Sequence, residues 1–221
     1  MKDKAKEMAK DTKNAGLLLA CIDLVTAMDK QADASLPQEI ANVVKLHTKG
    51  ATATALGVAW IPGAGGKIAL AANAAVIWTM YLRINHLLGI KISKNIAKTV
   101  AAGVASNLAI NAVVVVAVTT VVSLFPGVGS LGASATMGVA TYGMVIAAGH
   151  IYIKILTRIF KAGKDPNTLS GDELNNLSKE VMENENVKSL MKEAKKEYTR
   201  AKSSGELEEW KNIKVDLEDW Q

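Results

Sequence analysis

The sequence predicts an all-α protein: a helical bundle with a Gly/Ala-rich hydrophobic helical hairpin and a soluble, charged helical tail. Residues 51–164 contain nine Lys or Arg and no Asp or Glu, and residues 99–153 within them are 55 consecutive uncharged residues. By contrast, residues 165–221 hold nine basic and fourteen acidic side chains, and residues 1–50 are nearly balanced. Soluble domains average about 25% charged residues, so the uncharged run indicates an apolar environment.

The uncharged run divides into two arms at a Pro-Gly turn over residues 126–130. Residues 99–124 would form a helix of about 39 Å, and residues 131–153 one of about 35 Å. Each exceeds the roughly 30 Å hydrocarbon core of a bilayer, so each can span it with some tilt. We therefore expect a membrane-embedded hairpin. The alternatives are a hairpin buried in a soluble bundle and, for the valine-rich residues 113–116 and 121–122, a buried strand.

A shorter hydrophobic hairpin is expected over residues 51–82, with its turn at 62–66. Its 11-residue leading arm is too short to cross a bilayer, which favours a re-entrant, interfacial or buried element. A shift of 64 residues superposes the two turns, so the hairpins are either a duplication or a coincidence of Ala/Gly-rich composition. The turn residues matched in this way are Pro62, Gly63 and Gly65 with Pro126, Gly127 and Gly129.

Basic residues flank both outer ends of the longer hairpin, whose turn carries no charge. Under the positive-inside rule both ends would lie in the cytoplasm, where lysine and arginine contact anionic lipid headgroups. Asn107 and Asn111 lie four residues apart on one helix face, and we expect them to make polar contacts with a neighbouring helix. The predicted headgroup contacts are Lys91, Lys94, Lys98, Lys154, Arg158, Lys161 and Lys164.

The N-terminal residues 1–50 are predicted to form amphipathic helices over 15–29 and 37–49, the second with proline in its first turn. The leader holds three acidic residues and only a short apolar stretch, so we expect no cleaved signal peptide.

The tail, residues 165–221, is predicted to be a soluble acidic helical region. A capping box, Ser170-x-x-Glu173, opens a charged helix that extends to about residue 200, and a break follows near 203–205. The apolar stripe of this helix either packs against the core or binds a partner. Its members are Leu174, Leu177, Val181, Val187, Leu190 and Met191.

No catalytic or cofactor site can be assembled from the sequence. Residues 62–67 resemble a phosphate-binding loop but lack its first glycine and the hydroxyl that should follow Lys67. Residues 127–132 have the spacing of a dinucleotide fingerprint, yet no acidic residue follows before Asp165. The three histidines have no carboxylate near in sequence, and a single cysteine excludes a disulfide or a multi-cysteine zinc site. We therefore expect a non-enzymatic protein without cofactor or metal that does not bind nucleic acid.

The order of several short segments resembles the YcjF-like helical domain family of bacteria, over roughly residues 51–157. That resemblance implies a membrane-associated α-helical module without established catalytic residues. Because only 50 residues precede the match, any GTPase linked to it would be a separate partner chain. The segments are Ile61-Pro62, Met-Tyr-Leu-Arg-Ile at 80–84, Leu-Gly-Ile-Lys-Ile-Ser at 88–93, Phe-Pro-Gly-Val-Gly-Ser at 125–130 and Thr-Tyr-Gly at 141–143.

Together these observations favour a protein of the bacterial cytoplasmic membrane, with both termini cytoplasmic, that anchors or scaffolds a cytoplasmic protein partner. Membrane lipids are its expected contacts, and a homo-oligomer is compatible with the same features. The alternative is a pore-forming or membrane-perturbing effector, whose hairpin is buried in a soluble form and inserts on oligomerisation. An ordinary soluble bundle is the third hypothesis.

Overall fold

The computed structural model describes residues 15–28, 35–58, 65–117, 129–213 and 215, and over these ranges it is helical with no strand. This confirms the all-α prediction. The valine run 113–116 lies inside a helix, so the strand alternative is wrong for it, whereas 121–122 lies outside the described residues. The elements are α2 (Ala15–Ala27), α3 (Leu36–Val58), α4 (Gly65–Leu88), α5 (Lys94–Ala117), α6 (Gly129–Lys161), the 3₁₀ turn η2 (Pro166–Thr168), α7 (Gly171–Asn184), α8 (Val187–Ser203) and α9 (Glu206–Trp210).

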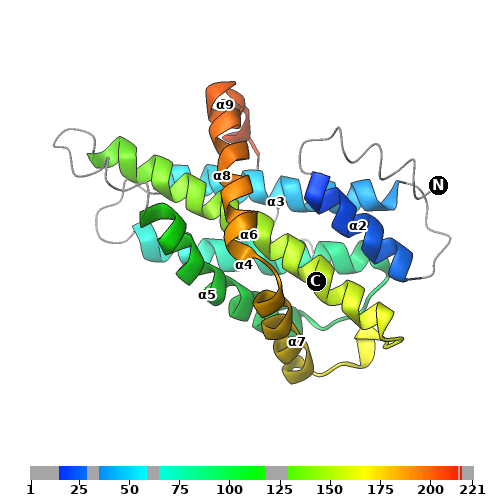
Figure 1. Cartoon of the computed structure of the whole chain (residues 1–221). Helices are drawn as coiled ribbons and strands as arrows, with labels where there is room; N and C mark the ends of the chain where they lie inside the picture. Colours follow the sequence, from blue (N-terminus) through cyan, green and yellow to red (C-terminus); the bar gives the residue numbers. More distant parts are fainter. Residues whose placement is uncertain (1–14, 29–34, 59–64, 118–128, 214, 216–221) are drawn as a thin grey trace.

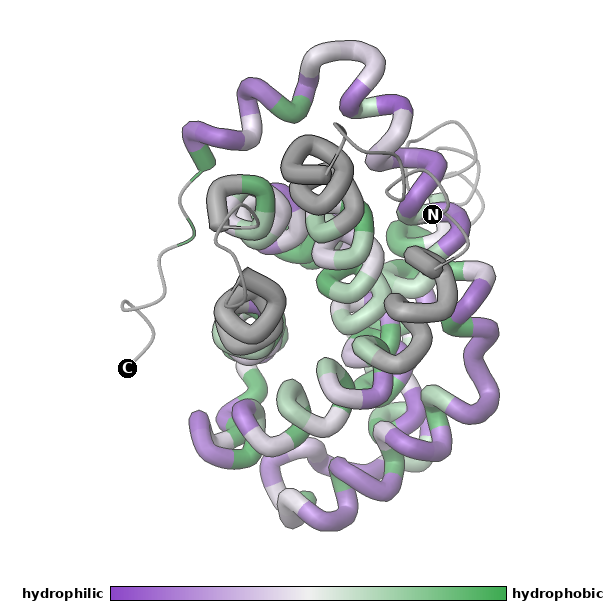
Figure 2. Tube along the Cα trace, turned by 90° about the vertical axis from the view of Figure 1, so that its left-hand side faces the viewer, coloured by the Kyte–Doolittle hydropathy of each residue, from purple (hydrophilic) through white to green (hydrophobic). Residues whose placement is uncertain are grey.

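The long helices α3 to α6 lie side by side, and α7 and α8 run across them (Figure 1). Helix α6 is the centre of the bundle, because it contacts α2, α3, α4, α5, α7 and α8. Figure 2 looks along the long helices and shows hydrophilic positions on the outer turns of the chain, around more hydrophobic inner helices. The most apolar segments are therefore packed against one another.

Helix α3 packs against α4, and α5 packs against α6, which is the pairing that two successive hairpins require. Four of the six predicted turn residues, Pro62, Gly63, Pro126 and Gly127, lie outside the described residues. Gly65 and Gly129 are the first residues of α4 and α6. The ends of α3 and α5 and the starts of α4 and α6 lie at the same end of the bundle (left in Figure 1).

The boundary expected at residue 50, between the N-terminal helices and the acid-free core, falls inside a continuous helix. Helix α3 runs through Gly50, although glycine lowers helix propensity. A Cβ atom at Gly50 would overlap Cγ2 of Val215, so the missing side chain makes room for the C-terminal segment. Tertiary packing therefore explains this glycine, which a sequence pattern alone would place at a helix boundary.

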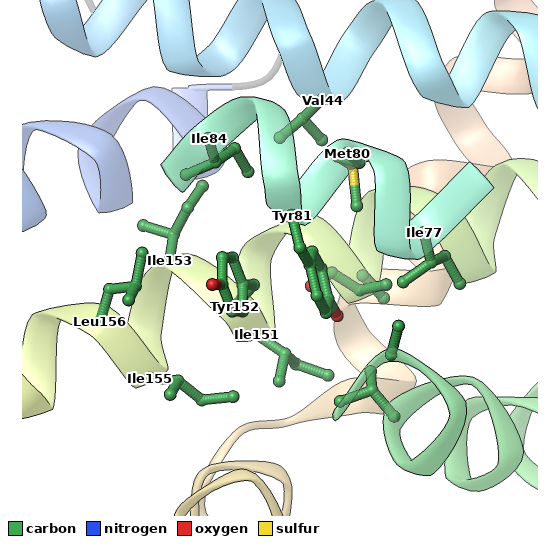
Figure 3. Packing of buried hydrophobic residues seen from close by; sticks show 14 of the residues in the cluster. Val44, Ile77, Met80, Tyr81, Ile84, Ile151, Tyr152, Ile153, Ile155 and Leu156 are labelled. Carbon is green, nitrogen blue, oxygen red and sulfur yellow. The ribbon is translucent and has the colours of Figure 1, made fainter. Parts of the chain in front are cut away.

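A large part of the main hydrophobic cluster lies where α6 meets α3 and α4 (Figure 3). A Cβ atom at Gly149 would lie 2.6 Å from Cγ1 of Val44, so this glycine allows α3 and α6 to approach closely. The rings of Tyr81 on α4 and Tyr152 on α6 stack with their centroids 3.9 Å apart. Both rings are fully buried, and isoleucine and leucine side chains of α6 surround them.

The predicted charged helix of the tail is divided into α7 and α8, which we call the C-terminal arm. The capping box is present: the Ser170 hydroxyl accepts a hydrogen bond from the Glu173 backbone, and the Glu173 carboxylate accepts one from the Ser170 backbone. Glu185 is extended, and the Asn186 side chain caps α8 by accepting from the Ser189 backbone. The predicted break after Ser203 is also present, since Gly205 has a φ of 81°.

The apolar stripe of the C-terminal arm packs into the core, as the first of its two interpretations requires. Leu174, Val181, Val187 and Met191 are buried in the same hydrophobic cluster as α6. A second, smaller cluster joins the end of the arm to α9 through Tyr142, Tyr198 and Trp210. The arm is thus part of the bundle.

Candidate functional site

The face of α6 that meets the C-terminal arm carries a row of polar side chains. Tyr142, His150, Lys154 and Arg158 are separated by multiples of four residues, so they follow a row that winds around the helix by about 40° with each step of four. Acidic residues of the arm lie opposite them. We call this set of contacts the polar seam.

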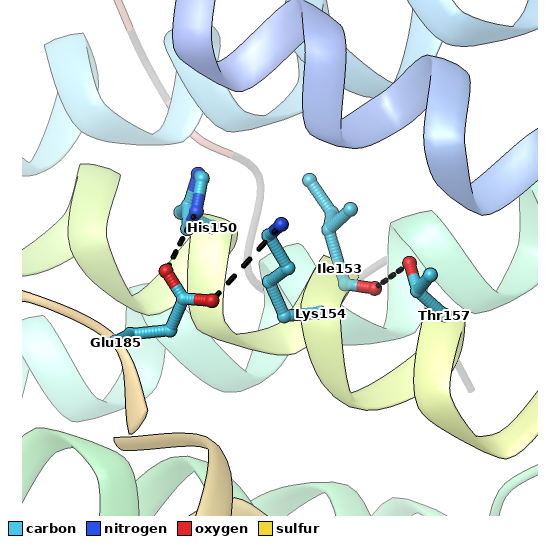
Figure 4. Close-up of polar contacts among 5 residues, drawn as sticks. All are labelled: His150, Ile153, Lys154, Thr157 and Glu185. Carbon is cyan, nitrogen blue, oxygen red and sulfur yellow. Dashed lines mark hydrogen bonds and ion pairs between the residues drawn. The ribbon is translucent and has the colours of Figure 1, made fainter. Parts of the chain in front are cut away.

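Glu185 occupies the centre of the polar seam (Figure 4). Its Oε2 lies 3.6 Å from Nε2 of His150, and its Oε1 lies 4.0 Å from Nζ of Lys154. The extended backbone between α7 and α8 gives Glu185 this position, so the break in the arm has a local electrostatic consequence. Burial lowers the pKa of His150, and the nearby Glu185 carboxylate opposes this shift only in part.

Two further contacts extend the polar seam on either side of Glu185. Nη1 of Arg158 donates to Oε1 of Glu180 at 2.6 Å, and the Tyr142 hydroxyl donates to Oε2 of Glu197 at 3.1 Å. Burial raises the pKa of Tyr142, and the Glu197 charge raises it further, so the phenol stays a proton donor. The Arg158 and Glu180 side chains remain substantially exposed, and pairs of this kind contribute only about 0.2–1 kcal/mol each.

Of the seven predicted headgroup contacts, five are exposed: Lys91, Lys94, Lys98, Lys161 and Lys164. The other two, Lys154 and Arg158, pair with acids of the C-terminal arm, which the sequence pattern did not predict.

The two basic flanks lie near each other. The Lys91 backbone N–H donates to Oδ1 of Asn167, which joins the start of α5 to the turn after α6. Lys94 and Lys98 both lie over the ring of Trp78, at 5.4 and 4.9 Å from its centroid. Such cation–π contacts hold the two ammonium groups against the surface of α4.

The predicted polar contact between helices at Asn107 and Asn111 stays a prediction. Asn107 is exposed, and its amide donates to the Gly103 carbonyl of its own helix at 3.0 Å. The side chain of Asn111 lies outside the described residues.

Buried polar contacts between α4 and α6 were missed by the sequence reasoning. The Tyr152 hydroxyl donates to Oδ1 of Asn85 at 2.7 Å, and Nδ2 of Asn73 donates to the Thr141 hydroxyl at 3.2 Å. Asn73 interrupts an apolar stretch of α4, which is the signal that could have identified it, whereas Asn85 lies among polar residues and gives no such signal. A buried amide needs a hydrogen-bond partner, and each of these contacts fixes the register of α4 against α6.

The described residues offer little reactive chemistry. Over these ranges, no group of three or more His, Cys, Asp or Glu could hold a metal ion. Burial raises the pKa of the Cys21 thiol to about 12, so the reactive thiolate is not formed at neutral pH. His47 uses Nδ1 to donate to the Val43 carbonyl and lies in a buried position. The expectation that the protein is not an enzyme stays a prediction.

Among the described residues, one helix is long and apolar enough to cross a membrane, over Met137–Lys161. Inside the bundle, 83% of its most apolar stretch is buried, as in the core helix of a soluble protein. A single span would also place the two ends of the chain on opposite sides, so it does not support a membrane location with both termini cytoplasmic.

Comparison with known proteins yields no relative. No family model matches the sequence, and searches of curated proteins and of solved structures give no match either. The resemblance to the YcjF-like family therefore stays a hypothesis based on the short segments that carry it.

Proposed function

We propose that the protein is a membrane-associated helical anchor or scaffold, which inserts one end of its bundle into the bilayer and keeps the C-terminal arm outside. The observation that carries this proposal is the distribution of charge relative to the arm. Beyond the arm, the four long helices carry Lys67 as their one charged residue, counting α3 from residue 50, α4 to residue 74, which lies beside the contact of Asn73 with Thr141, α5 from residue 103 and α6 to residue 142.

The position of the arm defines where this uncharged end begins. A Cβ atom at Gly103 would lie 3.4 Å from Asn175 of α7, and one at Gly138 would lie 2.6 Å from the Tyr198 hydroxyl of α8. From these crossings, α5 continues for about 21 Å and α6 for about 14 Å at 1.5 Å per residue. These lengths match about half of a 30 Å hydrocarbon core, which favours insertion into one leaflet over spanning.

Insertion of this end would keep the charged elements on one side of the membrane. The uncharged end lies on the left in Figure 1. Helix α2, the C-terminal arm and the basic start of α5 lie away from it. A cytoplasmic location of both termini is therefore compatible with the proposal, and the exposed charged face of the arm is then available to a cytoplasmic protein.

The test measures tryptophan quenching by lipids that are brominated in their acyl chains, in vesicles of mixed zwitterionic and anionic lipid. Trp60 lies between α3 and α4 in the sequence, two residues after the end of α3, whereas Trp210 is buried beside the arm. Quenching is expected in the unsubstituted protein, to be lost in W60F and to persist in W210F. Failure of the protein to bind the vesicles, or equal quenching in both variants, would contradict the proposal.

A matched pair of charge substitutions separates membrane insertion from surface binding. Val115→Asp places a charge in the uncharged part of α5, and Thr199→Asp places the same charge on the exposed surface of α8. Flotation with vesicles should be lost for the first variant and kept for the second, because a carboxylate at membrane depth costs several kcal/mol. Circular dichroism checks that both variants are folded.

The burial of the most apolar stretch of α6 favours a second candidate, a membrane-perturbing protein that opens before it inserts. Replacing Gly143 and Ala194 by cysteine would test it, because a Cβ atom at Gly143 would lie 4.0 Å from that of Ala194. This separation suits a disulfide that locks α8 onto α6, in a chain whose Cys21 is replaced by alanine. If opening is required, dye leakage from vesicles should stop on oxidation and return on reduction. An anchor would bind equally in both states without leakage.

A further inference from the structure

A groove between α3 and α4 has a composition that the proposed membrane function does not explain. Its volume is about 590 Å³, and its walls come from both helices together with Ile213 after α9. Most of its lining side chains are apolar or basic. The apolar members are Val43, Leu46, Leu87 and Ile213; the basic ones are Lys45, Lys49, Arg83 and His86; and Glu39 is its one acidic member.

Two properties of the groove indicate that it suits an acidic, apolar peptide. Leu46 is 36% exposed and is the one large hydrophobic side chain classed as exposed among the described residues. Burial is the main cause that lowers the pKa of Lys45; the Glu197 carboxylate offsets part of this shift, and the positive charge of Lys49 adds to it. An acidic group in the groove would counteract the charge of Lys49, and an apolar group would cover Leu46.

The chain itself approaches this groove at its C-terminal end. Trp210 is buried beneath Lys49, whose Nζ lies 5.6 Å from the ring centroid. Ile213 then lines the groove, and Val215 lies against α3 at Gly50. The residues that follow Val215 therefore start at the edge of the groove.

The sequence of residues 216–221, which lie outside the described part of the chain, complements the groove. It is Asp-Leu-Glu-Asp-Trp-Gln, with three acidic residues around Leu217 and Trp220. Six extended residues reach at most about 20 Å. The stretch of α3 from Lys49 back to Glu39 is about 15 Å long, so the segment is long enough to follow it.

We propose that the groove between α3 and α4 is a docking site for the chain's own acidic segment 216–221. The carboxylates face Lys45, Lys49 and Arg83, and Leu217 or Trp220 covers Leu46. Because the tether holds the segment at the groove, its effective concentration there is in the millimolar range. The groove is then covered in the resting protein, and an acidic apolar segment of a partner must displace the tail to bind. This inference does not depend on membrane insertion, which involves the opposite end of α3.

The test uses the full chain labelled with 5-fluorotryptophan, with the Trp220 resonance assigned from W220F. The solvent isotope shift of this ¹⁹F resonance between H₂O and D₂O reports how far water reaches Trp220. We expect a shift severalfold smaller than that of a free peptide of residues 214–221. Leu46→Asp should raise it to the peptide value, because the new charge repels the segment and removes its apolar contact.

Two controls make the result specific. Gln38→Asp adds the same charge to an exposed position of α3 outside the groove and should leave the shift unchanged. Replacing Asp216, Glu218 and Asp219 by their amides should increase the exposure of Trp220, as should added salt. A Trp220 resonance that is fully exposed in the unsubstituted protein, or unaffected by Leu46→Asp, would overturn the proposal. Protection that disappears on dilution would instead assign the groove to a second copy of the chain.

Discussion

The two sides of α6 hold their neighbours by different physical means. Toward α3 and α4, contact is close and largely apolar, with Gly149 against Val44 and the Tyr152 ring stacked on Tyr81, and the hydrogen bonds between α4 and α6 are buried within it. Toward the C-terminal arm, the polar seam adds half-exposed ion pairs to an apolar stripe. The first side depends on shape and the second depends partly on charge. Conditions that change charge, such as salt and pH, should therefore act on the arm side, while packing substitutions should act on the α3 side.

The largest expected effect comes from pH. It is expected on the α3 side of α6, where packing alone would predict little sensitivity to charge. Burial lowers the pKa of His47, on the α3 side, to about 4 from an ordinary value of 6.5, and the positive charge of Arg83 contributes. The unfolded chain therefore binds this proton more readily than the folded protein does. Stability is retained above pH 6.5 and falls as the pH drops toward 4, by up to about 3 kcal/mol.

Comparison of two variants identifies the responsible histidine. His47→Gln should remove most of this acid sensitivity in urea denaturation at pH 7 and pH 4.5. His150→Gln should remove less, because Glu185 and Glu193 oppose the effects of burial and Lys154 on the pKa of His150. If the two variants rank in the reverse order, the polar seam rather than the α3 side controls acid stability.

The next effect concerns packing on the α3 side. Gly149→Ala should destabilise the protein by about 2 kcal/mol, because the added methyl group collides with Val44 at the crossing of two helices. Gly143→Ala, on the same helix, is the matched control: the nearest atoms would lie 3.8 Å away, on Met191. There the better helix propensity of alanine should stabilise by about 0.5–1 kcal/mol. Thermal unfolding of the two variants should give shifts of opposite sign.

The smallest effect belongs to the polar seam and sharpens the comparison. A double-mutant cycle of Arg158→Ala and Glu180→Ala should give a coupling energy of about 0.2–1 kcal/mol that decreases with added salt. Urea denaturation at low and high ionic strength measures it. A coupling energy well above this range that does not depend on salt would mean that the polar seam stabilises its side of α6 as strongly as packing stabilises the α3 side.

Local signals explain which parts of the fold could be predicted from the sequence. The Ser170 capping box and Gly205 act over a few residues, and both mark helix boundaries in the structure. The break at Glu185 was missed because it contains neither glycine nor proline. Its capping residue, Asn186, is no clear signal either, because asparagine also occurs within helices. At Gly50 the error was the opposite one, since a boundary was predicted where the helix continues. The role of this glycine depends on Val215, which is far away in the sequence.

The candidate site was harder to predict because its partners are distant in the sequence. His150 has no carboxylate near it along the chain, yet Glu185 contacts it from the C-terminal arm. The charge count separated a basic core from an acidic tail and gave no pairing between them, whereas those charges attract each other in the folded bundle. Opposite net charge on two segments is as compatible with docking as with separation, and apolar stripes decide between them.

The buried thiol of Cys21 can report how often α2 separates from the rest of the bundle. It is the one thiol of the chain, it sits on α2 with no exposed surface, and its high pKa keeps it unreactive while α2 remains packed. An aromatic disulfide reagent can therefore react at this atom only during moments when α2 lifts away from the bundle. If reclosing is fast, the reaction rate divided by that of an unstructured thiol equals the fraction of time spent open. The reaction rate of this single thiol therefore measures an opening of the bundle that is too rare for spectroscopy to detect.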